Sequence, residues 1–247
     1  MKTLHYFYEW IVSFYQGFFS WFFDLQFFDA DKVVVSTKFT EAHIFGSGAS
    51  IITSKILAKK NAFKMTCNLA AAVLPQWELV LVEKLGITDY GNKQFSLLLQ
   101  RKINNIVLKN IYPWYFNIKP GLVKKLSNVY LLRECQIQQD DNLEYVVDKL
   151  LISRAKYYQY ASSILTMIII AKNLGFKKIV LHGIDFDQSS FTDNIEYNQF
   201  SFKLKSNLAS TKHSTETLQL PVSAVLKQLI RLLKAQGVDI LFANELA

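Results

Sequence analysis

The sequence has few of the residues that mark special classes of chain. Its 247 residues include 2 cysteines, 4 prolines and 9 glycines, and only 19% are charged. Cys67 and Cys135 are too few for a disulfide framework and suit a reducing compartment. The low glycine and proline content, together with 51% hydrophobic residues, excludes a disordered, collagen-like or low-complexity chain. We therefore expect one sizeable folded domain, with room for a small appendage.

Several familiar site motifs are also missing. No GxxxxGK[ST] occurs, which disfavours a P-loop kinase or ATPase. The four histidines form no cluster with zinc-ligand spacing. Asp185 and Asp187 could bind a cation or cap a loop, but we expect a site that uses no metal. The basic residues are scattered and match no RNP, helix-turn-helix or zinc-finger pattern, so nucleic acid is not an expected partner.

The net charge of +8 belongs to the main body of the chain, because residues 1–31 hold four acidic residues and a single lysine. A basic body favours an anionic partner. Charge alone leaves a nucleotide sugar, a phospholipid surface and nucleic acid open.

The first 28 positions hold 13 aromatic residues. At helical spacing, one face would contain Phe7, Trp10, Ile11, Phe14, Phe18, Trp21, Leu25 and Phe28, and another Glu9, Ser13, Gln16, Ser20 and Asp24. The uncharged run 10–23 has 14 residues, whereas a spanning helix needs about 20. We expect residues 4–28 to form an amphipathic helix in the plane of a membrane surface. The alternative is a helix that packs on the domain or on a second copy of the chain, which leaves a homo-oligomer open.

The rest of the chain alternates short apolar runs with helical patterns. We expect strands at 42–45, 62–67, 78–82, 106–111, 129–132, 177–181 and 238–242, and helices at 49–60, 92–105, 161–174 and 222–236. Gly175 and Gly237 follow two of these helices at the C′ position, as is typical of the loops of a parallel sheet. The pattern predicts an α/β protein, a doubly wound α/β/α sandwich with a mainly parallel sheet.

In such a sheet the ligand site lies at the carboxyl ends of the strands. The turn GSGAS at 46–50 would bring backbone amides close to a phosphate, with Ser47 and Ser50 as hydroxyl donors, although such a turn also serves tight packing alone. Ser50 could equally be the N-cap of the next helix. His213 is the candidate general base, with an exposed loop histidine as the alternative. Residues 185–215 are polar and aperiodic, which suggests a lid.

The order of these motifs resembles bacterial sialyltransferases of glycosyltransferase family 42. That family has G-N-G-P-S after the first strand, C-N after the second, T-S-G at a helix start, S-G-I-D-F at a strand end and G-H-S in a lid. The matching positions here are 46–50, 67–68, 162–163, 182–186 and 212–214. The strongest stretch is SSILTMIIIAKNLGFKKIVLHGIDF at 162–186.

The resemblance implies a GT-A-like, single nucleotide-binding domain over residues 32–247. Residues 1–31 lie outside the resemblance, and their aromatic pattern predicts a membrane-associating segment. The resemblance also implies an inverting transferase without metal or other cofactor, which moves a sialic-acid-like sugar from a CMP donor. Ser47 and Gly48 would then lie at the phosphate, with Ser50 nearby. Asn68 would lie near the sugar and nucleotide, Ser163 at the sugar carboxylate, and Gly183 with Asp185 near the cytidine. Ser162 would be a further donor-binding residue. His213 would deprotonate the acceptor hydroxyl.

Asp187 and Phe191 occupy positions where the family has phosphate-binding tyrosines. Candidates for that role here are Lys212, Tyr160 and Tyr197. The resemblance further implies a lipooligosaccharide, capsule or lipid-linked glycan as acceptor. Together with the aromatic helix, this predicts a peripheral location on the cytoplasmic face of the inner membrane. Two alternatives remain: a non-catalytic nucleotide-binding or scaffold protein on the same fold, and a transferase that uses CMP-Kdo or another nucleotide sugar.

Overall fold

The computed structural model describes residues 2–33, 35–48, 61–83, 85, 89–109, 120–137, 142–184, 216 and 218–243. The α-helices are α1 (Lys2–Phe23), α3 (Asp89–Gln100), α4 (Pro120–Val123), α5 (Leu143–Leu151), α6 (Ser163–Asn173) and α9 (Val222–Ala235), with short 3-10 helices η1 (Ala30–Lys32) and η2 (Asn68–Ala72). The strands are β1 (Gln26–Phe27), β2 (Ala42–Phe45), β3 (Phe63–Cys67), β4 (Gln76–Trp77), β5 (Leu79–Val82), β6 (Lys102–Ile103), β7 (Ile106–Leu108), β8 (Val129–Leu131), β9 (Glu134–Gln136), β10 (Tyr157–Gln159), β11 (Lys178–His182) and β12 (Asp239–Phe242).

Eight of these strands form one sheet in the order β1-β8-β7-β5-β3-β2-β11-β12. Every neighbouring pair in it is parallel. From β2 the chain moves outward through β3, β5, β7 and β8, and later returns to the other side of β2 through β11 and β12. The predicted doubly wound α/β class is therefore confirmed, and the topological switch point lies between β2 and β11.

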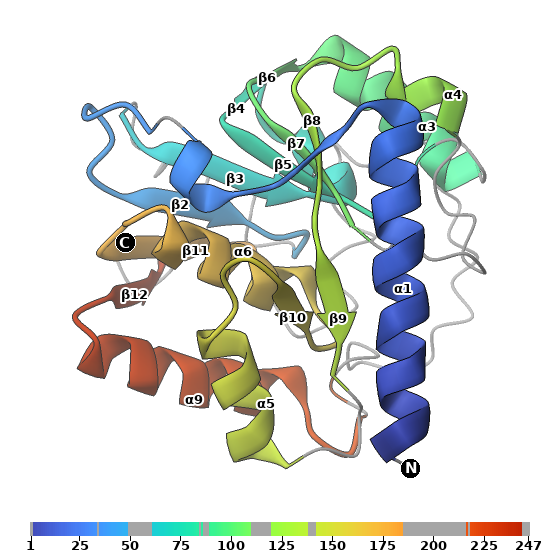
Figure 1. The fold of residues 1–247 in the computed structure, drawn as a ribbon. Coiled ribbons are helices and arrows are strands. Elements are labelled where there is room, and N and C mark those ends of the chain that lie inside the picture. The colour runs from blue at the N-terminus through green and yellow to red at the C-terminus, as the bar shows by residue number, and fades with distance from the viewer. Residues whose placement is uncertain are drawn as a thin grey trace.

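Both faces of the sheet are buried, which explains why its strands are continuous apolar runs rather than alternating ones. Leu79, Leu81 and Val107 belong to a core shared with α5, α6 and α9. Their neighbours Val80 and Leu108 belong to a second core shared with η2, α3, α4 and Phe19 of α1. Figure 1 shows α5, α6 and α9 grouped together, away from α1, α3 and α4.

The expected strands of the main sheet lie within a few residues of the observed ones, and β2 matches residue for residue. The two glycine caps are confirmed, since Gly175 and Gly237 have φ values of +91° and +76°. The expected helix at 49–60 lies outside the described residues.

Other expected bounds were wrong. The helix predicted at 92–105 spans Asp89–Gln100, and the chain then pairs as β6 with β4. The strand predicted at 106–111 ends at Leu108. Helix α5 and strands β9 and β10 were not predicted.

Helix α1 packs on the domain through a side that combines Glu9 and Gln16 of the expected polar face with the buried Val12 and Phe19. Gln16 is buried against β9, and the Glu9 carboxylate accepts from Lys156 Nζ at 3.2 Å and from Cys135 Sγ at 2.7 Å. The helix was expected to extend to residue 28, but α1 ends at Phe23. Residues 26–27 pair with β8 as the edge strand of the sheet. The N-terminal segment is thus built into the fold.

The opposite side of α1 faces outward. The large side chains there are 49–77% exposed, and we call them the aromatic face of α1: Phe7, Trp10, Phe14, Phe18, Trp21 and Phe22. Among the described residues, no helix has the length and apolarity needed to cross a membrane. An exposed aromatic patch of this kind marks an interaction surface.

Candidate functional site

Five strands end at the same edge of the sheet because they are parallel. Gly46–Gly48 follow β2, Asn68 follows β3, Glu83 follows β5, Lys109 follows β7 and Gly183 follows β11. Hydrogen bonds and an ion pair link neighbouring strand ends, and they also link the ends of β5 and β7 to the first turn of α6.

The glycine turn after β2 packs tightly against the end of β11. A Cβ on Gly46 would lie 2.5 Å from the Gly183 oxygen and 2.7 Å from Ile184 Cδ1. The Gly46 amide donates to the His182 oxygen and the Gly48 amide to the Gly183 oxygen, both at 2.8 Å. This turn therefore serves close packing, and two of its amides donate hydrogen bonds within the protein. The half-buried Ser47 lies between them.

Asn68 adopts a left-handed backbone conformation, with φ of +50°, which asparagine tolerates better than most residues. Its Oδ1 accepts from the Glu83 amide at 3.0 Å and from Gln94 Nε2 at 3.4 Å. Burial raises the pKa of the preceding Cys67 thiol to about 12, and Glu83 adds to the rise. Cys67 is thus a thiol at neutral pH and not a thiolate nucleophile.

A buried ion pair joins the ends of β5 and β7. Lys109 Nζ lies 2.6 Å from Glu83 Oε1 and donates to Ser163 Oγ at 3.0 Å, and Ser163 donates its own proton to Glu83 Oε1. Burial acts to raise the pKa of Glu83, but Lys109, Ser163 and Asn68 together hold it below its usual value. Glu83 is therefore ionised at neutral pH. We call Glu83, Lys109 and Ser163 the Glu-Lys-Ser centre.

The neighbouring serine and tyrosine have structural contacts. Ser162 is the N-cap of α6, and its Oγ accepts from the Ile164 amide at 3.3 Å. Tyr160 is fully buried, and its hydroxyl donates to the Leu220 oxygen at 2.6 Å. This bond ties the turn before α6 to the segment before α9. The idea that Tyr160 contacts a phosphate stays a prediction.

The structure thus brings Ser47, Gly48, Asn68, Ser163 and Gly183 to one edge of the sheet. Ser162 and Tyr160 have the contacts given above. The remaining candidates lie outside the described residues, as do the expected lid 185–215 and positions 187 and 191: Ser50, Asp185, Tyr197, Lys212 and His213. Their proposed roles remain untested predictions.

Sequence reasoning missed Glu83, Lys109 and Gln94. The first two each follow an apolar strand, LVLV and IVL, and that position was the available signal. A single charged residue after a strand is also common in ordinary loops, so the signal was not distinctive. Gln94 has no such mark, because it lies within α3.

A second polar chain runs along β2 and β11. Lys178 Nζ lies 3.1 Å from Glu41 Oε2, Glu41 Oε1 lies 3.2 Å from His43 Nε2, and His43 Nδ1 lies 2.8 Å from His182 Nε2. The His182 ring stacks on Phe45 at 4.3 Å. Burial, with His43 as a neighbour, lowers the pKa of His182 to about 3, so His182 is neutral.

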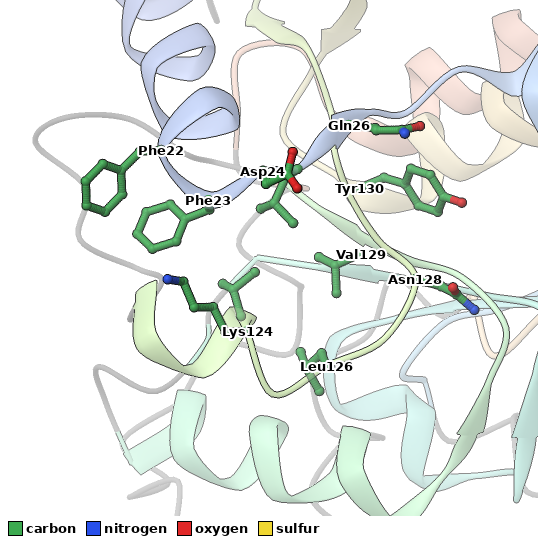
Figure 2. A pocket seen from close by; sticks show the side chains of 11 residues that line it. Phe22, Phe23, Asp24, Gln26, Lys124, Leu126, Asn128, Val129 and Tyr130 are labelled. Atoms are coloured by element: carbon green, nitrogen blue, oxygen red, sulfur yellow. The ribbon is translucent and has the colours of Figure 1, made fainter.

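A pocket of about 530 Å³ lies elsewhere. Figure 2 shows three parts of its lining: Phe22 and Phe23 at the C-terminal end of α1, Lys124 directly after α4, and Val129 at the start of β8. The pocket lies at the amino ends of β1 and β8 and not at the carboxyl ends of the strands. Within the described ranges, no group of three acidic, histidine or cysteine side chains could hold a metal ion.

No family model and no curated protein matches this sequence. Among solved structures, it is similar to α-2,3-sialyltransferase from Campylobacter jejuni in apo form, with 19% identity over 86% of this chain and 78% of that one and a TM-score of 0.44. It is also similar to Cst-I of that organism (19% identity, 86% and 78% covered, TM-score 0.48). A third is CstII of that organism in complex with cytidine-5'-monophosphate (17% identity, 83% and 79% covered, TM-score 0.47). These similarities concern the fold alone.

Proposed function

We propose that this chain is a glycosyltransferase that moves a sugar from a CMP donor, of the sialic acid type, to a glycan hydroxyl. One observation carries the proposal. Motifs that are far apart in the sequence, at 46–48, 67–68, 162–163 and 182–184, lie along one carboxyl edge of a parallel sheet, at and beside its switch point, where nucleotide ligands bind in this class of fold.

The chemistry requires a stabilised leaving phosphate and an activated acceptor hydroxyl. Ser47 lies in the turn at the switch point, where it is suited to contact the phosphate. His213 is the proposed base, since an imidazole takes up a proton near neutral pH. Asp185 is proposed near the cytidine, and Lys212 or Tyr197 at the phosphate.

A non-catalytic nucleotide-binding protein is the second candidate. It is favoured by the internal partners of three groups that were expected to bind ligand: the Gly48 amide, the Ser163 hydroxyl and the Tyr160 hydroxyl. That candidate predicts nucleotide binding without turnover.

We further propose that the protein lies peripherally on the cytoplasmic face of the inner membrane, with a lipid-linked or lipooligosaccharide acceptor. The aromatic face of α1 supports this location, since tryptophan and phenylalanine are suited to the boundary between headgroups and acyl chains. The net charge of +8 would add attraction to anionic lipid.

The direct test is release of CMP by the purified chain with EDTA present. CMP-sialic acid and CMP-Kdo are offered with and without a panel of lipooligosaccharide-type acceptors. We expect acceptor-dependent release from one of the donors, and His213→Ala should lower it by about 10²- to 10⁴-fold with donor affinity unchanged. Absence of release from every donor and acceptor pair would reject the transferase.

A further inference from the structure

The Glu-Lys-Ser centre places the carboxylate of Glu83 at the carboxyl edge of the sheet. About a quarter of the Glu83 side chain is exposed (26%), whereas Lys109 beneath it is 4% exposed. A ligand at this edge would therefore meet the carboxylate of Glu83 before it meets the ammonium group of Lys109.

The hydrogen-bonding capacity of Ser163 is already used within the centre. Its one proton is donated to Glu83 Oε1, and its oxygen accepts from Lys109 Nζ at 3.0 Å. Ser163 thus has no proton to offer a ligand carboxylate, although the family resemblance places the sugar carboxylate at this position.

The position of Glu83 is fixed from the backbone side as well. Its amide donates to Asn68 Oδ1, which also accepts from the fully buried Gln94. Gln94 Oε1 is buried and has no hydrogen-bond partner among the described residues. Asn68 therefore holds the backbone of Glu83 in place at this edge, and Gln94 in turn holds the Asn68 side chain.

The charges of the centre restrict what can bind. An ionised carboxylate only accepts hydrogen bonds, and it repels an anionic group. A ligand cation would be opposed by Lys109, which lies 2.6 Å from Glu83 Oε1. Neutral donors remain. Because Glu83 Oε1 already accepts from Lys109 and Ser163, two neighbouring hydroxyl groups of a sugar would donate to Oε2, which can accept two hydrogen bonds.

We propose that Glu83 binds a pair of neighbouring hydroxyl groups of the ligand, on the ribose or on the transferred sugar, and that any ligand carboxylate binds elsewhere. Lys109 and Ser163 are positioning residues that hold the Glu83 carboxylate. This inference rests on the proposed function as far as a nucleotide sugar occupies the site. Glu83 lies two strands from the glycine turn, about 10 Å away, so one such ligand could reach both.

The test is isothermal titration of the full chain with CMP, 2′-deoxy-CMP, 3′-deoxy-CMP and CMP-sialic acid. Glu83→Gln keeps the shape of the side chain and removes its charge. Glu78→Gln is the matched control, because Glu78 precedes β5 at the opposite end and its Oε2 accepts from the Lys64 amide at 2.8 Å. If the unpaired Lys109 prevents Glu83→Gln from folding, the double variant Glu83→Gln/Lys109→Met removes both charges and takes its place.

If the ribose supplies the hydroxyls, wild type and Glu78→Gln bind CMP about tenfold or more tightly than a deoxy form, and both Glu83 variants lose this preference. If the transferred sugar supplies them, the Glu83 variants weaken CMP-sialic acid by a similar factor and leave CMP unchanged. Tighter binding of CMP-sialic acid by Glu83→Gln would overturn the proposal, because it would place the ligand carboxylate beside Glu83. Equal effects on all four ligands, or no effect, would also overturn it.

Titrations with UMP, GMP and their 2′-deoxy forms distinguish a failure of this inference from a failure of the proposed function. If these nucleotides bind with the same dependence on Glu83 while CMP does not bind, the hydroxyl site stands and the CMP donor is rejected. If no ribonucleotide binds to wild type, both are rejected.

Discussion

The fold leaves no room for a side chain at Gly46. An added Cβ would collide with the backbone of Gly183, which cannot move without disturbing β11. We expect Gly46→Ala to lower the free energy of unfolding by about 1–3 kcal/mol. Urea denaturation measures it, with Gly17→Ala as the control: Gly17 lies within α1 with no atom near its would-be Cβ, so alanine there should stabilise by up to about 1 kcal/mol. Equal effects of both changes would contradict the packing at the switch point.

His182 makes the stability depend on pH. Its folded pKa of about 3 lies below the ordinary value of 6.5, so the folded state binds fewer protons than the unfolded state. Stability from this residue is complete above about pH 6.5 and is lost as the pH falls toward 3, by up to roughly 5 kcal/mol.

The measurement is urea denaturation between pH 8 and pH 4. The variant His182→Gln keeps a polar side chain beside His43 but does not titrate, so it should lose less stability over this interval than the wild type. Parallel pH profiles for the two proteins would show that His182 does not titrate in this way.

The elements of the sheet were predictable because buried parallel strands are short, apolar and followed by turns. Strand β1 was not, since two residues of an aromatic segment look like part of the preceding helix. Helix α1 was predicted, and five residues assigned to its apolar face are exposed together: Phe7, Trp10, Phe14, Phe18 and Trp21. Its contacts with the domain were not predicted. Periodicity distinguishes an apolar face from a polar one, whereas Glu9 and Gln16 find partners on Lys156 and β9, and these tertiary contacts are not visible in the helix's own sequence.

The exposed face of α1 should be needed for binding to lipid and not for folding. The triple variant Trp10→Ser/Phe14→Ser/Trp21→Ser removes three exposed aromatic side chains. We expect at least about a tenfold loss of binding to vesicles of phosphatidylethanolamine and phosphatidylglycerol in a flotation assay, with an unchanged melting temperature.

Phe19→Ala is the control on the same helix, because Phe19 is 5% exposed and belongs to the second core. It should lower the free energy of unfolding by about 3 kcal/mol and leave vesicle binding unchanged while the protein is folded. A triple variant that unfolds would show instead that the aromatic face is covered by protein.

At the scale of the whole molecule, the topology of the sheet decides where a ligand is expected. The carboxyl edge combines the switch point, the glycine turn and the Glu-Lys-Ser centre, whereas the pocket near Phe22 and Lys124 lies at the amino edge. The sequence predicted the edge through its glycine turn and Asn68. It could not predict the ion pair of Glu83 with Lys109, because that contact depends on which strands become neighbours.

The most direct test of this account is amide hydrogen exchange of the full chain with and without CMP. We predict slower exchange at residues 46–48, 68, 83, 163 and 183, and no change at residues 22–26 and 123–130. Protection confined to residues 22–26 and 123–130, or no protection at saturating CMP, would contradict a nucleotide site at the carboxyl edge of the sheet.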